Sequence, residues 1–251
     1  MLSVGWGRQT TAALVLIATG RLPTPDALVF ADTGGEHQAT YDYIEQYGLP
    51  YCAAHGLAIT IVGAEWRIPS YCPTLEEYCL IHHMVPGTFA RWCTHHYKTE
   101  PISRWRVANL GASPINPTET WIGISTDESK RARAESLFKN ETLRYPLLEL
   151  GLSRTDCEQI IRDAGLPVPP KSGCFFCPFK SRSQWQQMKY AEPEAFGRAL
   201  AIEKNAHGRD GRPKYLPIFG PLQAVADQGE LPGFDEAIAA EAGCITGACF
   251  V

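Results

Sequence analysis

The sequence lacks an apolar run long enough to cross a membrane. Its longest, TAALVLIATG, has ten residues, whereas a membrane-spanning helix needs about 20. The N-terminus also lacks the basic stretch, apolar run and cleavage site that make up a secretory leader. We therefore expect a soluble, cytoplasmic protein without a membrane partner.

An excess of positive charge is missing as well. The formal net charge is −4 and the sequence pI is about 6.0. No overall basic field draws such a chain to nucleic acid or to an anionic membrane. A small anionic substrate, or nucleic acid held by a local basic patch, remains compatible with this composition.

Internal repeats and low-complexity tracts are also absent, and 251 residues with 45% apolar content predict one sizeable core. In the first half of the chain, buried strand-like runs alternate with helical patterns that end in glycine. This alternation predicts an α/β fold, a doubly wound and mostly parallel sheet with helices on both faces. The strand-like runs are DALVFAD (26–32), LAITIVG (57–63) and TWIGIS (120–125), and the helical patterns are TTAALVLIATG (10–20) and ATYDYIEQYG (39–48).

The second half predicts helices and loops. SRTDCEQIIRDAG (153–165) has a capping pattern, with Ser153 as N-cap and Asp156 three residues later. Residues 183–205 are also helical in pattern, with an interruption near Pro193, whereas residues 66–113 look irregular. We expect an α/β part over residues 1–150 and a helical region with a mobile tail over residues 151–251, in one continuous domain.

Cysteine is abundant, with nine residues. A reducing compartment makes structural disulfides improbable, so clustered cysteines indicate a metal or redox site. The clusters are Cys72 with Cys79, Cys93, Cys174 with Cys177, and Cys244 with Cys249. Cys52 and Cys157 stand alone, and we interpret both as buried apolar residues.

A glycine-containing loop, SVGWGRQTT (3–11), precedes the first helical pattern. Glycines let backbone N–H groups approach a phosphate, and the helix N-terminus adds a favourable dipole. Only two residues precede Ser3, so the first strand is either very short or begins upstream of Met1. About thirty residues later Asp32 ends the next strand, in the place where doubly wound sheets bind a nucleotide.

These two segments together resemble the phosphoadenosine phosphosulfate (PAPS) reductase family of the PP-loop, adenine-nucleotide alpha-hydrolase-like superfamily. The resemblance covers most of residues 1–200 and continues in RWCTHHYKTEPISRWR (91–106), IGISTDESKR (122–131) and residues 145–179. It implies an adenine nucleotide (ATP, adenosine phosphosulfate or PAPS) bound by Ser3, Gly5, Gly7, Gln9, Thr10, Asp32, Thr33, Gly34 and Glu128. PP-loops that cleave ATP usually carry an acidic residue where this chain has Gln9, so a preformed nucleotide is favoured.

Cluster-bearing members of the family have a Cys-Cys pair before a K-x-E-P element, and a later CxxC. Here the resemblance implies a [4Fe–4S] cluster on Cys93, Cys174 and Cys177. Only three ligands match, because Thr94 stands where the family has the second cysteine of the pair. Three alternatives remain for the fourth position: Cys79 or Cys72 supplies it, it is open to substrate, or the site is a Cys3His zinc site with His95 or His96.

The family also places a nucleophilic cysteine on a mobile C-terminal tail. By resemblance, Cys249 is the candidate nucleophile and Cys244 its resolving partner. The ending CITGACFV departs from the usual tail, which leaves an incidental pair of thiols as the alternative. Lys98 and Arg131 are the candidate anion-binding cations, since both belong to family elements.

The leading hypothesis is a sulfur-metabolism oxidoreductase that attacks a sulfonucleotide with a thiol and uses a thioredoxin-like reductant. The main alternative is an iron–sulfur sulfurtransferase that thiolates tRNA or DNA. A third is a non-catalytic zinc or cluster-binding partner subunit. A homodimer is left open.

Overall fold

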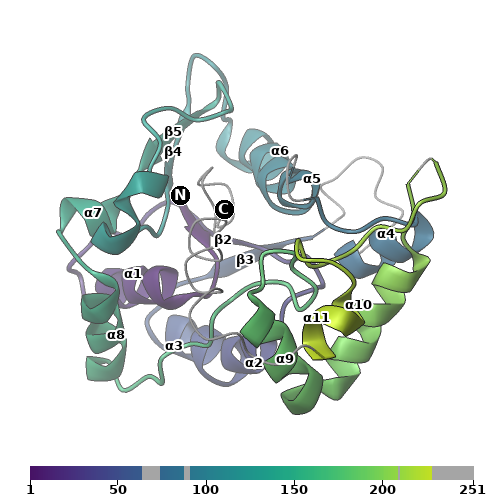
Figure 1. Ribbon diagram of the computed structural model, residues 1–251. Helices are drawn as coiled ribbons and strands as arrows, with labels where there is room; N and C mark the ends of the chain where they lie inside the picture. Colours follow the sequence, from purple (N-terminus) through teal and green to yellow (C-terminus); the bar gives the residue numbers. More distant parts are fainter. Residues whose placement is uncertain (64–73, 88–90, 209, 228–251) are drawn as a thin grey trace.

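The computed structural model describes residues 1–63, 74–87, 91–208 and 210–227. Five parallel strands form one sheet in the order β3-β2-β1-β4-β5 (Figure 1). The strands are β1 Leu2–Val4, β2 Leu28–Ala31, β3 Ile59–Val62, β4 Thr118–Trp121 and β5 Glu141–Arg144. This topology confirms the predicted doubly wound α/β fold. The first strand is short, and it pairs with both β2 and β4.

Helices connect the strands. They are α1 Arg8–Ala18, α2 Gln38–Tyr43, α3 Leu49–Ala54, α4 Leu75–Ile81, α5 Trp92–Thr94, α6 Glu100–Leu110, α7 Pro146–Glu149, α8 Arg154–Asp163, α9 Arg182–Ala191, α10 Pro193–Asn205 and α11 Leu222–Asp227. The described residues also contain two π-helical turns, η1 Ile44–Gly48 and η3 His95–Thr99, and the 3-10 helix η4 Thr126–Arg131. Among the described residues, no helix has the length and apolar character that a membrane span requires.

The sheet has an apolar core on each face, because successive side chains of a strand point to opposite sides. Leu2, Val4 and Phe30 belong to the core that α1 and α8 cover. Val29 and Ala31, which alternate with them, pack with Ile102 of α6 on the other face. Figure 1 shows these two helical layers on either side of the strands.

A second core joins the C-terminal helices to the middle of the chain. Trp185 of α9 and Ile202 of α10 are fully buried there, together with Cys79 of α4 and Phe176 of the CxxC loop. The interruption at Pro193 and the Ser153–Asp156 capping box are both present, as predicted. The division into residues 1–150 and 151–251 within one continuous domain stays a prediction.

Two local predictions were wrong. Gly48 does not end a helix, because η1 leads directly into α3. A Cβ at Gly48 would lie 2.4 Å from Cζ3 of Trp6, so the glycine allows close packing rather than termination. The stretch expected to be irregular, residues 66–113, contains α4, α5, η3 and α6. The sequence did not reveal α6 because its buried side includes the charged Arg106 beside apolar residues, which breaks the apolar pattern of a helix.

Candidate active site

The centre of the sheet is a topological switch point. From β1 the chain winds to β2 and β3 on one side, and it later returns to β4 on the other side of β1. In open α/β sheets the crevice for a ligand lies at the carboxyl ends of the strands at such a point. Here the loops that follow β1, β2 and β4 surround that position, and two halves can be distinguished there.

The first half consists of residues 5–10 and 122–131, and we call it the nucleotide half. The loop after β1 is fixed by Trp6, which has a left-handed φ of 53° and a fully buried ring in edge contact with Phe30. Gly7 is the N-cap of α1 and offers no side chain to the first-turn amides. This arrangement suits an anion at the start of α1. Ser3, by contrast, lies inside β1 with its side chain buried.

The loop after β4 packs directly on the start of α1. A Cβ at Gly123 would lie 2.7 Å from Cγ2 of Thr10, and Gln9 Nε2 donates to Glu128 Oε2 at 3.2 Å. Glu128 also pairs with Arg131 at 2.7 Å and with Arg154 at 2.9 Å. Gln9 is therefore held by the β4 loop, in a carboxylate–guanidinium network.

The second half consists of residues 32–37, 93–98 and 172–180, and we call it the sulfur half. The CxxC loop is joined to the loop after β2 by two backbone hydrogen bonds, from Phe175 N to Gly35 O (2.9 Å) and from His37 N to Gly173 O (3.2 Å). The same loop reaches the nucleotide half, since a Cβ at Gly7 would lie 3.0 Å from Ser172 Oγ. The two halves thus meet at Gly7 and Ser172.

Asp32 lies at the end of β2 with one carboxylate oxygen already engaged. Its Oδ1 accepts hydrogen bonds from Gly34 N at 2.8 Å and from the Tyr41 hydroxyl at 2.7 Å. The pKa of Tyr41 is raised mainly by burial and secondly by the charge of Asp32. The phenol therefore stays protonated and donates its hydrogen bond to Asp32. Thr33 Oγ1 lies 3.7 Å from Cys174 Sγ, which links the predicted nucleotide residues to the cysteines.

The three cysteines predicted as metal ligands lie in the same neighbourhood. Burial raises the pKa of each thiol, and the proximity of Cys177 raises that of Cys93 further. Cys79 is fully buried, and burial and then the proximity of Cys93 raise the pKa of its thiol. The sulfur atoms of Cys93, Cys174 and Cys177 do not all lie within 4.8 Å of one another.

Lys98 is the cation that these thiols share. It lowers the pKa of Cys93, Cys174 and Cys177, against the larger effect of burial. Its Nζ lies 3.2 Å from Oε1 of Glu36, whose side chain is 3% exposed. The other carboxylate oxygen of Glu36 is buried and has no hydrogen-bond partner among the described residues. The sulfur half therefore contains a buried ion pair with unused acceptor capacity.

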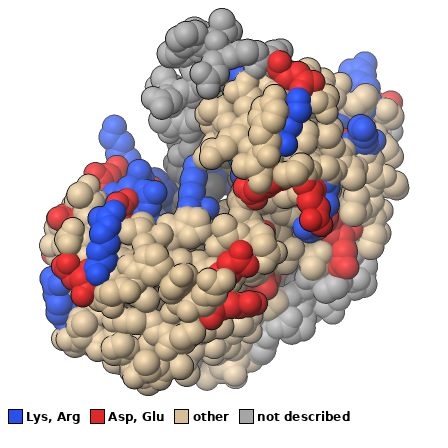
Figure 2. All heavy atoms as spheres, turned by 90° about the horizontal axis from the view of Figure 1, so that it is seen from below, with Lys and Arg blue, Asp and Glu red and all other residues tan. Residues whose placement is uncertain are grey.

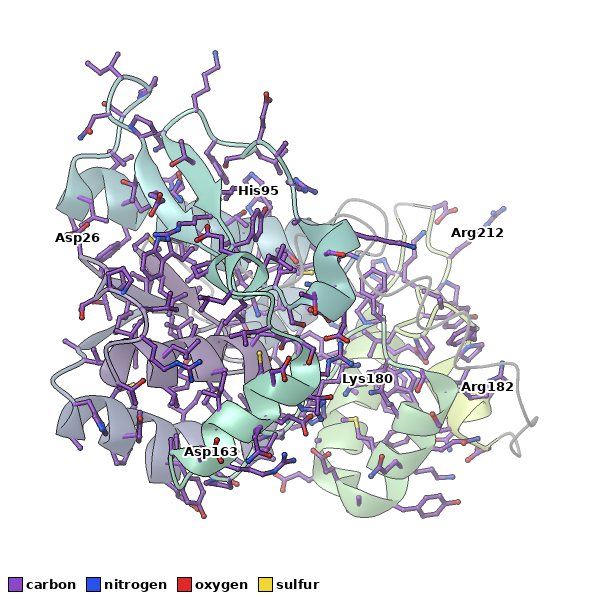
Figure 3. All side chains as sticks on the ribbon, turned by 90° about the vertical axis from the view of Figure 1, so that its left-hand side faces the viewer. Asp26, His95, Asp163, Lys180, Arg182 and Arg212 are labelled. Carbon is purple, nitrogen blue, oxygen red and sulfur yellow. The ribbon has the colours of Figure 1, made fainter. Side chains whose placement is uncertain are left out.

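A second half-buried cation, Lys180, follows the CxxC. Its Nζ contacts His37 Nε2, and His37 Nδ1 lies 2.9 Å from Glu192 Oε2. Because the ammonium donates to Nε2, the ring proton lies on Nδ1 and is donated to Glu192. Burial, and next the Lys180 charge, lower the pKa of His37. Figure 3 places Lys180 between the sheet and the C-terminal helices.

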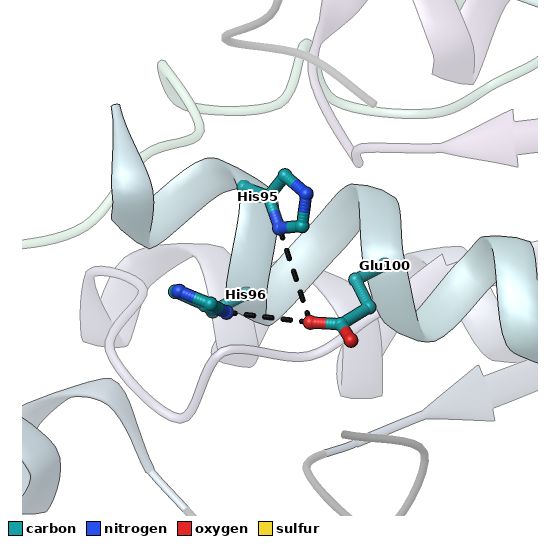
Figure 4. A group of neighbouring side chains, drawn as sticks. All are labelled: His95, His96 and Glu100. Atoms are coloured by element: carbon teal, nitrogen blue, oxygen red, sulfur yellow. Dashed lines mark hydrogen bonds and ion pairs between the residues drawn. The ribbon is translucent and has the colours of Figure 1, made fainter. Parts of the chain in front are cut away.

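His95 and His96 face Glu100 (Figure 4). We searched the described residues for three or more potential metal ligands whose ligand atoms all lie within 4.8 Å of one another. His95, His96 and Glu100 form such a group, and it contains no cysteine. A preformed Cys3His site is therefore not present in the described part of the chain.

Arg131 lies at the border of a cavity of about 60 Å³ between α6 and the carboxyl end of β4. Thr99, the residue after Lys98, lines the same cavity together with Ile122 and Ile124. Figure 2 shows a hollow on one face of the molecule with Lys and Arg side chains in it. Lys98 itself does not line this cavity, because its Nζ is paired with Glu36.

Some of the predicted site residues lie outside the described residues, namely Cys72, Cys244 and Cys249. Other residues of the site were missed from the sequence: Ser172, Glu36, His37, Lys180 and Glu192. Glu36 lies four residues after Asp32, and Lys180 lies three residues after Cys177. Their positions next to Asp32 and next to the CxxC were the sign in the sequence that these charged residues belong to the site.

Comparisons with known proteins give one solved structure to report. No family model matches the sequence, and no curated protein matches it. A phosphoadenylyl-sulfate (PAPS) reductase from Candida auris, in a phosphate complex, is 18% identical, with 67% of this chain and 74% of that chain covered and a TM-score of 0.48.

Proposed function

We propose that this protein is a sulfur-metabolism enzyme that binds an adenylyl nucleotide at the switch point and acts on it with sulfur. The observation that carries the proposal is the contact between its two halves. The CxxC loop is hydrogen-bonded to the loop after β2, and Ser172 touches Gly7 at the start of α1. The CxxC loop and the start of α1 therefore share one edge of the sheet, which supports the proposal.

The nucleotide would lie over the loop after β1. Gly5, Gly7, Gln9 and Thr10 would hold phosphate through backbone and side-chain donors, and Asp32, Thr33 and Gly34 would border the adenosine. The ion pair between Glu128 Oε2 and Arg131 Nη1 (2.7 Å) would orient the guanidinium for hydrogen bonds to phosphate or sulfate oxygens. Lys98 would supply a second positive charge beside the sulfur atoms.

The cysteines fit an iron–sulfur cluster as a donor set. Cys93, Cys174 and Cys177 would hold it, and Cys79, fully buried beside Cys93, is the candidate for the fourth ligand. Ligation takes thiolates, and the positive charge of the iron would offset the cost of a buried thiolate, which now keeps these thiols protonated. A bound cluster would supply local charge next to the nucleotide.

The reaction we propose is thiol attack on a sulfonucleotide. A thiolate, for which Cys249 is the candidate, attacks the sulfur atom, the sulfur–oxygen bond to the phosphate breaks, and the adenosine phosphate leaves with its negative charge. A second thiol then attacks the S-sulfonate, which releases sulfite and forms a disulfide. A thioredoxin-like dithiol reduces that disulfide by two electrons.

An anaerobic titration tests this proposal. The protein is titrated with ATP, adenosine phosphosulfate and PAPS, and sulfite is measured after a thioredoxin-type reductant is added. We expect a sulfonucleotide to bind tightest and to yield one sulfite per nucleotide. The matched variants are Cys249→Ser, expected to abolish sulfite release, and Cys157→Ser, which removes a buried thiol of the α8 side. Full sulfite release by Cys249→Ser would contradict the assigned nucleophile.

A second function, thiolation of tRNA or DNA, is favoured by one observation. The residue after Cys93 is Thr94, so only three thiols match the family pattern, and an open cluster position suits transfer of an activated sulfur. This function requires ATP, whereas Gln9 is neutral. Conversion of ATP to AMP on addition of tRNA or DNA, without sulfite release from a sulfonucleotide, would select it over the reductase.

A further inference from the structure

A group of side chains just before and within the K-x-E-P element (residues 98–101) is not used by the proposed function. His95 and His96 lie on the π-helical turn η3, and Glu100 begins α6. Nδ1 of His96 lies 3.3 Å from Glu100 Oε2, and Nδ1 of His95 lies 3.8 Å from the same oxygen (Figure 4). Two imidazole nitrogens and one carboxylate oxygen therefore converge.

The π-turn explains how this convergence arises. Adjacent residues of a regular α-helix point about 100° apart, and only residues three or four apart face each other. Glu100 is four residues from His96 but five from His95, and a π-turn brings residues five apart together. The two rings, with centroids 5.1 Å apart, thus reach the same carboxylate.

The two nitrogen–oxygen distances are also compatible with a small cation bound between the three side chains. Zinc–nitrogen and zinc–oxygen distances of about 2.0–2.2 Å in a tetrahedron place two ligand atoms about 3.4 Å apart. The measured 3.3 and 3.8 Å bracket this value. The longer distance exceeds an ordinary hydrogen bond, although the His95 ring still faces the oxygen.

The surroundings orient the carboxylate. Arg104 donates to Glu100 Oε1 from Nε at 3.1 Å and from Nη2 at 2.7 Å, which leaves Oε2 directed at the rings. Hydrogen bonds of this kind to a ligating carboxylate are typical of metal sites. The side chain of His95 is 57% exposed, so solvent cations can reach the group.

We propose that His95, His96 and Glu100 bind one divalent transition-metal ion, with Zn²⁺ as the preferred cation. Two imidazoles and a carboxylate suit zinc and leave positions open for water or a ligand. This site is distinct from the cysteines, because no described cysteine belongs to the group. A cation there would fix the π-turn that carries Lys98, and it is independent of which sulfur reaction the protein performs.

Cobalt binding to the full-length, chelator-treated protein tests the site under anaerobic conditions. Co²⁺ gives visible d–d bands with nitrogen and oxygen ligands, whereas thiolate ligands add a near-ultraviolet charge-transfer band. We expect His96→Asn and Glu100→Gln to bind one Co²⁺ fewer than the wild type, with the thiolate band unchanged. His55→Asn is the matched control, since His55 is an exposed histidine that contacts Tyr51, and it should bind as the wild type does.

A second measurement covers the case in which these variants fold poorly. Saturating Zn²⁺ should raise the Tm of the wild type by roughly 5 °C, through mass action on the native state. His95→Asn alters only an exposed ring, and we expect it to weaken Co²⁺ binding by about tenfold or more. Unchanged cobalt stoichiometry and d–d bands in His95→Asn, His96→Asn and Glu100→Gln would overturn the proposal.

Discussion

The two halves of the carboxyl edge are built differently. The nucleotide half is held by glycine contacts and by hydrogen bonds such as Gln9 to Glu128, and the carboxylate of Glu128 is 19% exposed and shared between Arg131 and Arg154. The sulfur half contains Glu36, Lys98, His37 and Lys180, all charged or titratable and largely removed from water. Charge changes should therefore disturb the sulfur half most, whereas changes of side-chain volume should disturb the nucleotide half.

Lys98→Met is expected to have the largest effect. It would leave the buried Glu36 carboxylate without its partner, and breaking a buried pair from one side costs about 3–5 kcal/mol. Because the Lys98 side chain keeps some exposure, we expect the free energy of unfolding to fall by about 3 kcal/mol. Denaturant unfolding measures it. Arg162→Met, which breaks the exposed pair with Glu158, is the control and should cost below about 1 kcal/mol; equal losses would refute the distinction.

Gly48→Ala probes the packing under the nucleotide half. The new methyl group would lie 2.4 Å from the buried Trp6 ring. Overpacking of this kind costs about 1–3 kcal/mol, and displacement of Trp6 should also weaken nucleotide binding. Gly197→Ala in α10 meets nothing within 4 Å and should be neutral or slightly stabilising. A Gly48→Ala protein as stable as Gly197→Ala would show that Trp6 does not fix the loop.

Acid should destabilise the sulfur half through His37. Its pKa is lowered below 6.5, first by burial and then by Lys180. The unfolded chain therefore binds more protons than the folded one as the pH falls below about 6.5, and stability declines in that range. We expect the loss between pH 7 and pH 5 to be smaller by about 1 kcal/mol in His37→Gln. Parallel pH profiles of the two proteins would contradict a role for His37.

Gln9→Glu should have the smallest effect. It would place a carboxylate where the Gln9 amide now lies 3.2 Å from Glu128. Like charges at a partly exposed site repel by about 1 kcal/mol, so nucleotide affinity should fall about fivefold. Gln9→Ala, which only removes the hydrogen bond, should change the affinity less. A gain of ATP cleavage by Gln9→Glu would instead indicate that residue 9 alone selects the nucleotide.

The sequence predicted those parts of the fold that depend on local pattern. Apolar runs marked β2 and β3, and Ser153 marked the start of α8. β5 was missed because ETLR is short and only partly buried. Gly48 looked like a helix end, since no local pattern reveals that Trp6, 42 positions earlier, packs on it.

The candidate site was predictable only in its motifs. The cysteines and glycines were visible as short spaced patterns, and the structure brings their loops together. The buried charges come from contacts between distant segments, namely Glu36 with Lys98 and His37 with Lys180. Each of these residues looks like ordinary surface charge in the sequence, because pairing and burial are set by the tertiary fold.

The measurement that tests the central claim most directly is protection of the cysteines by nucleotide. Anaerobic protein is alkylated with and without adenosine phosphosulfate or PAPS, and modification of Cys174 and Cys177 is quantified by mass spectrometry, together with the iron content. We predict that the nucleotide slows modification of both residues at least tenfold, while Cys52 on the α3 side is unaffected. Tight nucleotide binding with unchanged modification of Cys174 and Cys177 would contradict a shared site.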